Sequence, residues 1–168
     1  MRLLNALSAL ITSLVLMAAP ALAQTSANNL TGKMAPFNYV FGTPFNCTSN
    51  VPAMGGQPAH TENTTATFEA VSNNVLHVHI AGSEFVGDQY FGYSTQGNTY
   101  WSTSAASDGS ASVETSADGT SYRGSMNMGP MSGTAQDVYS KTDNNHVSIR
   151  SSATIGGQTA ATTISCSR

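Results

Sequence analysis

The chain has 168 residues, of which 40% are hydrophobic and only 9% are charged. This length suits one domain with a sizeable core, whereas two domains would be cramped. Six basic residues against nine acidic ones give a net charge of −3 at pH 7, which argues against nucleic acid and anionic membranes as partners.

Residues 1–23 have the pattern of a secretory signal peptide. A charged start at Arg2 leads into an apolar run over residues 6–19, and Ala21-Leu22-Ala23 suits cleavage after Ala23. Cleavage would leave five basic against nine acidic residues, a net charge of −4. No later run approaches the ~20 apolar residues that a membrane span needs. We therefore expect an exported monomer, periplasmic or extracellular, with no integral membrane segment in the mature chain.

Residues 24–39 are expected to form a leader that precedes a domain over residues 40–168. Leu30, Met34 and Phe37 provide apolar anchors in this leader, and Pro36 should limit any helix to about one turn. We expect the segment to plug one end of the structure.

From residue 40 onward the sequence is typical of antiparallel β-structure. Turn signals such as Asp108-Gly109 and Asp118-Gly119 recur about every ten residues, and the segments between them are rich in residues that favour strands. This predicts an all-β fold, an up-and-down meander that closes into a barrel of eight to ten strands. The candidate strands span residues 40–49, 61–71, 75–81, 84–94, 98–105, 110–116, 120–128, 131–141, 146–153 and 158–166.

Two cysteines lie in the first and last of these strands. In a meander, those two strands become neighbours only if the sheet curls and closes. An oxidising compartment lets cysteines pair, so we predict a disulfide between Cys47 and Cys166.

Aromatic residues fall on both faces of the predicted strand 84–94, which suggests that something besides water covers part of it. The aromatic set of the whole chain can line a pocket, and it is also what a packed β core of this size needs. Both interpretations stay open. The candidate ligand-binding residues are Phe68, Phe85, Phe91, Tyr93, Tyr100, Trp101, Tyr122 and Tyr139.

Two histidines are the first candidate metal ligands. His77 and His79 share one face of a strand whose other face is apolar, and side chains two residues apart lie about 7 Å from each other. The alternative is a pair of surface histidines. His60 and His146 could complete a metal or haem site only if the fold brought them near.

A methionine cluster is the second candidate metal site. Met126, Met128 and Met131 offer thioether sulfurs, which are soft ligands suited to Cu(I). The alternative is that these side chains fill irregular gaps in the core.

Catalytic patterns are absent from the sequence. There is no Gly-x-Ser-x-Gly motif, Glu62 and Glu69 do not share a strand face, and the double glycines precede no helix that could bind phosphate. We therefore expect a protein that is not an enzyme.

Short motifs resemble a known group of proteins. They are the segment 42–48, Tyr100-Trp101, Asp108-Gly109 and Cys166-Ser167-Arg168. Together they resemble the small exported bacterial domains of unknown function related to the lipocalin-like, or calycin, barrels. The resemblance implies a barrel able to hold a small apolar molecule.

The leading hypothesis is a non-catalytic exported protein that binds a small apolar or amphipathic molecule. The alternatives are a metal- or haem-binding protein and a structural or surface-interaction domain without a ligand. The sequence leaves the identity of any cofactor open.

Overall fold

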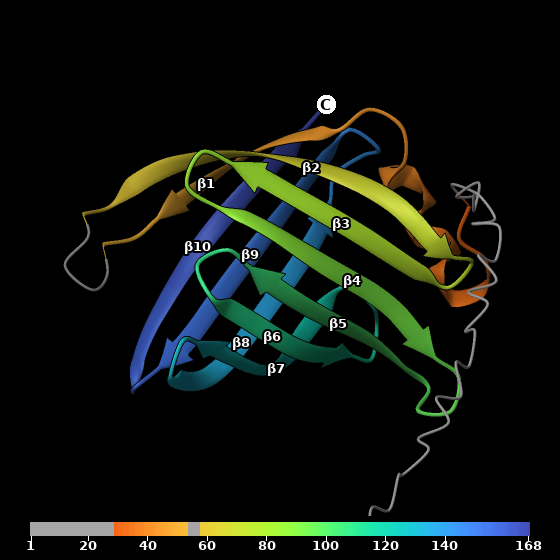
Figure 1. The fold of residues 1–168 in the computed structure, drawn as a ribbon. Coiled ribbons are helices and arrows are strands. Elements are labelled where there is room, and N and C mark those ends of the chain that lie inside the picture. The colour runs from red at the N-terminus through yellow and green to blue at the C-terminus, as the bar shows by residue number, and fades with distance from the viewer. Residues whose placement is uncertain (1–28, 54–57) are drawn as a thin grey trace, which may run out of the picture.

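The computed structural model describes residues 29–53 and 58–168, and these form an all-β barrel (Figure 1). Ten antiparallel strands follow one another in meander order, and the last pairs with the first to close the ring. This confirms the predicted fold class. The predicted signal peptide, residues 1–23, and the start of the leader lie outside the described residues.

The ten strands match the predicted segments to within a few residues. Their bounds are β1 Phe45–Val51, β2 His60–Ser72, β3 Val75–Gly82, β4 Val86–Ser94, β5 Thr99–Ala106, β6 Ser110–Ser116, β7 Ser121–Met128, β8 Met131–Lys141, β9 His146–Ile155 and β10 Gln158–Ser167. The main difference is at the start, where β1 begins five residues later than the expected strand. The chain before it, Gly32–Val40, forms a 3₁₀ helix, η1.

Turn chemistry explains why the strand ends were predictable. In the turn between β6 and β7, the Asp118 carboxylate accepts hydrogen bonds from the backbone amides of Thr120 and Ser121, at 2.8 and 2.9 Å. These bonds favour the ionised form and lower the pKa of Asp118 below its usual range. Such local contacts are encoded within a few residues of sequence.

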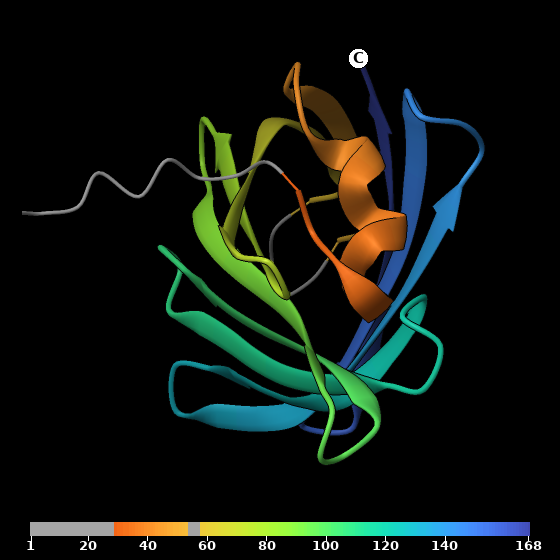
Figure 2. The ribbon, with the colours of Figure 1, turned by 90° about the vertical axis from the view of Figure 1, so that its right-hand side faces the viewer.

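The helix η1 lies across one end of the barrel (Figure 2). Leu30, just before it, and Met34, within it, are 1% and 0% exposed and belong to the core. The hydroxyl of Tyr100 donates to the carbonyl of Lys33 at 3.2 Å, which fixes the helix to β5. The expected plug is therefore present.

The expectation that Pro36 would limit the helix to about one turn is wrong, because η1 runs for nine residues with Pro36 inside it. Proline removes only one backbone donor. Buried anchors hold the segment, and Asn38 closes it by accepting from the amide of Leu30 at 2.7 Å and donating to the carbonyl of the same residue at 2.9 Å.

The C-terminal Arg168 ties this plug to the barrel. Its guanidinium lies over the ring of Phe45, 4.6 Å from the ring centroid. It also donates to five backbone carbonyls, those of Tyr39, Val40, Phe41, Thr43 and Asn144. One side chain thus joins the end of η1, the following turn and the β8–β9 turn.

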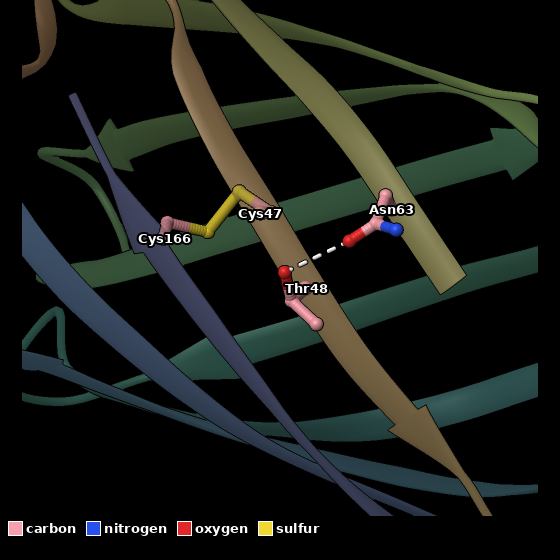
Figure 3. The surroundings of a disulfide bond; sticks show 4 residues. All are labelled: Cys47, Thr48, Asn63 and Cys166. Carbon is pink, nitrogen blue, oxygen red and sulfur yellow. Dashed lines mark hydrogen bonds between the residues drawn. A yellow bond between two sulfur atoms is a disulfide. The ribbon is translucent and has the colours of Figure 1, made fainter. Parts of the chain in front are cut away.

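A disulfide joins the strands that close the ring (Figure 3). Cys47 of β1 lies directly opposite Cys166 of β10, their Cα atoms are 4.0 Å apart, and both side chains are buried. This confirms the predicted pairing. The adjacent Thr48 donates to Asn63 of β2 at 2.9 Å. Within the described residues, no helix has the length and apolar character needed to cross a membrane.

Candidate ligand cavity

The barrel encloses a cavity of about 450 Å³. Its wall is mainly aliphatic and aromatic, with contributions from Leu76 and Val78 of β3, Ile149 of β9 and Ile164 of β10. These residues occupy alternate strand positions, so their side chains point to the same, inner face. The volume falls within the range of small-molecule binding sites.

Five of the eight predicted aromatic residues line this cavity. They are Phe68, Phe85, Phe91, Tyr122 and Tyr139. These five side chains form a large part of the aromatic wall, and their role in ligand binding stays a prediction.

The other three aromatic residues do not line the cavity. Tyr93 and Tyr100 pack edge to face at the plugged end, with ring centroids 5.0 Å apart, and Tyr100 also contacts Phe37 of η1. Trp101 follows Tyr100 by one residue, so its side chain lies on the outer face of the barrel. There its indole covers Gly92 so closely that a Cβ at this glycine would clash with it. Strand alternation accounts for this separation of Tyr100 from Trp101.

Three aromatic rings meet on one side of the cavity. Phe91, Tyr122 and Tyr139 contact one another edge to face, with centroids between 5.5 and 5.7 Å apart. Beside them, Gln89 donates its side-chain amide to the hydroxyls of Ser102, at 2.9 Å, and Tyr139, at 3.2 Å. The apolar cavity therefore has a polar region in its wall.

Two carboxyl groups lie in the strands beside this polar region without lining the cavity, the buried Glu114 on β6 and the half-buried Asp137 on β8. Glu114 is 2% exposed, and its Oε1 accepts a hydrogen bond from Ser112 at 2.9 Å. Burial and the nearby charge of Asp137 raise the pKa of Glu114 to about 6. Burial also raises the pKa of Asp137, although hydrogen bonding from Ser151 and Tyr139 opposes the rise.

Sequence reasoning missed both carboxyl groups and Gln89. In β6 the hydrophobic residue Val113 points outward and is 61% exposed, while Glu114 points inward. The rule of hydrophobic alternation would place Val113 inside and Glu114 outside, which is the reverse of the observed arrangement. Asp137 was detectable in principle, since it precedes the inward-facing Tyr139 by two residues and so shares its face.

Gly124 of β7 allows the close strand approach beside Glu114. Gly124 pairs with Glu114 across the strands, and a Cβ at this glycine would clash with the carbonyl oxygen of Val113. A larger residue would push β7 away from β6.

The histidines predicted as metal ligands lie on the outer face of the barrel. Asp88 Oδ1 is 2.8 Å from His77 Nε2 and 2.9 Å from His79 Nδ1, and Glu69 Oε1 is 2.7 Å from His77 Nδ1. Partial burial by itself lowers the pKa of His77, but the hydrogen bonds and charges of Glu69 and Asp88 outweigh it and raise the pKa overall. Both ring nitrogens of His77 are therefore engaged by carboxylates.

The other two histidines do not join this cluster. His146 hydrogen-bonds Asp143 within the β8–β9 turn, and His60 lies 3.9 Å from Glu84. In the part of the chain that the structure describes, no three or more His, Cys, Asp or Glu residues are grouped as a metal site requires.

The methionine cluster divides between two environments. Met126 and Met128 share the inner face of β7 and are half-buried, and Met128 lines the cavity. Met131 pairs with Met128 across the β7–β8 ladder but is 51% exposed.

A comparison with protein families finds no family model that matches the chain, and a comparison with curated proteins finds no match. Function therefore has to be inferred from the interior of the barrel.

Proposed function

We propose that this protein is a non-catalytic, exported carrier that binds a small apolar or amphipathic molecule inside the barrel. The observation that carries the proposal is the cavity of about 450 Å³ with its mainly apolar wall. An apolar cavity gives water few hydrogen-bond partners. An apolar molecule gains about 25 cal/mol of binding free energy for each Å² of surface that it buries there.

Export is proposed from the signal-like start of the chain together with the disulfide, since disulfides persist in oxidising compartments. The closed meander barrel with one plugged end also supports the lipocalin-like kinship that the short motifs imply. Binding is favoured over catalysis because, among the described residues, no histidine or cysteine thiol lines the cavity to act as a base or a nucleophile.

A metal-binding function has less support. The two histidines best placed for it contribute to an ion-pair cluster with Glu69 and Asp88 on the outer face. A structural domain without a ligand is the remaining alternative, and a binding measurement separates it from a carrier.

The test is a fluorescence titration with Nile red, a neutral dye whose emission shifts to the blue in apolar surroundings. We expect saturable binding to the wild-type protein. In the variant Ala66→Phe, which puts a large ring at a buried lining position, we expect affinity to fall at least about tenfold, or 1.4 kcal/mol.

The matched control is Ala105→Phe, which adds the same ring on an exposed, outward position of β5 and should bind as the wild type does. Absence of saturable binding to the folded, disulfide-bonded wild type would contradict the proposal. So would equal affinity in the two variants.

A further inference from the structure

The charged side chains that line the cavity are all acidic, whereas Arg168 and Lys141 lie outside the lining, over the rings of Phe45 and Tyr39. Two ionisable acidic residues line it, Glu62 of β2 and Asp108 of the β5–β6 turn. No lysine, arginine or histidine of the described ranges takes part in the lining. A bound anion would therefore find no cationic side chain in the wall to compensate its lost hydration.

The polar region beside the aromatic wall also lacks cationic side chains and has acidic ones nearby. Gln89, Tyr122, Tyr139 and Ser151 line the cavity. Glu114 and Asp137 are not part of the lining, but each has a buried carboxyl oxygen in the neighbouring strands β6 and β8. Tyr122 and Asp137 lie directly opposite each other in the β7–β8 ladder, which brings this carboxyl group beside a tyrosine of the cavity wall.

Four buried side-chain oxygens in the described part of the chain have no hydrogen-bond partner. They are Glu62 Oε1, Glu114 Oε2, Asp137 Oδ1 and the hydroxyl of Tyr122. Three belong to carboxyl groups, and Tyr122, only 1% exposed, is itself part of the cavity wall. Leaving a buried polar group unpaired is unfavourable, so a barrel interior with several such oxygens is suited to a ligand that brings hydrogen-bond donors.

We propose that the ligand of this cavity is an amphipathic amine, whose apolar part fills the cavity and whose protonated amino group lies against the hydroxyl of Tyr122, with the carboxyl groups of Glu114 and Asp137 behind this part of the wall. This inference rests on the proposed carrier function. An ammonium group offers up to three hydrogen-bond donors and a positive charge, and it therefore matches the unpaired oxygens in both respects. A carboxylate offers only hydrogen-bond acceptors and carries a negative charge. A hydroxyl offers one donor and no charge, so its match to the unpaired oxygens is intermediate.

The test compares three probes with the same alkyl chain, dodecylamine, dodecanol and dodecanoate, as competitors of Nile red below their micelle-forming concentrations at neutral pH. We expect dodecylamine to displace the dye at concentrations at least about tenfold lower than dodecanoate, with dodecanol between them.

This comparison needs no variant and separates the two proposals. If the dye binds but dodecanoate competes as well as dodecylamine, the amine inference is overturned while the carrier function stands. If neither the dye nor any probe binds, the carrier function fails.

A double variant locates the selectivity. Glu114→Gln with Asp137→Asn should reduce the preference for dodecylamine over dodecanoate to within about threefold and leave dodecanol binding unchanged. The matched control, Glu84→Gln with Asp143→Asn, removes two charges from exposed side chains and should retain the full preference. A double interior variant that folds and keeps the wild-type preference would refute the assigned position of the amino group.

Discussion

At the scale of single residues, Glu114 stands out as an acidic side chain placed where ionisation is unfavourable. Because its pKa is raised to about 6 in the folded protein, from 4.5, the folded state holds this proton more tightly than the unfolded state does. The stability that protonated Glu114 contributes is complete below pH 4.5 and is lost as the pH rises through about 6.

Glu114→Gln should therefore make the protein more stable above pH 6, by up to about 2 kcal/mol, and have little effect near pH 4. Urea unfolding of the wild type and the variant at both pH values measures the difference. Glu84→Gln, which changes an exposed glutamate, should show no such pH dependence. A variant equally or less stable than the wild type at pH 7.5 would contradict the assignment of Glu114 as a destabilising buried charge.

Some inward and outward positions could be predicted from sequence and others could not. In β3 the alternation of Leu76 and Val78 with His77 was clear, and the structure buries the two apolar residues while placing the histidine outside. In β6 the rule fails, because Val113 is exposed and Glu114 is buried. Hydrophobic alternation assumes an apolar interior, so it misassigns a strand that carries polar groups inward.

At the scale of elements, the ends of strands were more predictable than η1. Most strand ends follow from local turn chemistry, such as the hydrogen bonds that the amides of Thr120 and Ser121 donate to the Asp118 carboxylate. The length of η1 depends instead on long-range contacts, including the bond between Tyr100 and Lys33, which are 67 residues apart. Such contacts cannot be inferred from the local sequence pattern around the helix.

Arg168 is the residue on which the position of η1 should depend most. Arg168→Ala removes the donors to five carbonyls and the contact with Phe45, so we expect a loss of about 1–3 kcal/mol in stability and faster amide hydrogen exchange in Gly32–Val40. Hydrogen exchange read by mass spectrometry measures both local and global opening. Arg123→Ala, at an exposed position of β7, is the control and should leave the exchange of η1 unchanged. Unaltered exchange of η1 in Arg168→Ala would show that the buried anchors hold the helix without it.

At the scale of the whole molecule, closure of the barrel was predictable but the cavity was not. Cysteines in the first and last strands of a meander require those strands to meet, and β1 pairs with β10 in the register that places Cys47 opposite Cys166. Whether the interior is filled depends on how all inward side chains pack, and this follows from their joint arrangement rather than from any motif. The sequence therefore did not distinguish a filled barrel from a hollow one, and the structure shows a cavity.

The disulfide should contribute a large part of the stability of the closed barrel. Cys47 and Cys166 are 119 residues apart, and for a loop of this length the chain-entropy model gives a contribution of up to about 5 kcal/mol. We expect Cys47→Ala with Cys166→Ala to unfold at clearly lower urea concentration than the wild type. Amide exchange should also become faster in β1 and β10, because without the bond this pair is held only by its ladder and can open to expose two strand edges. A reducing agent should lower the stability of the wild type to that of the double variant and leave the variant itself unchanged. Equal stability of the oxidised wild type and the double variant would mean that the barrel closes through β1–β10 pairing alone.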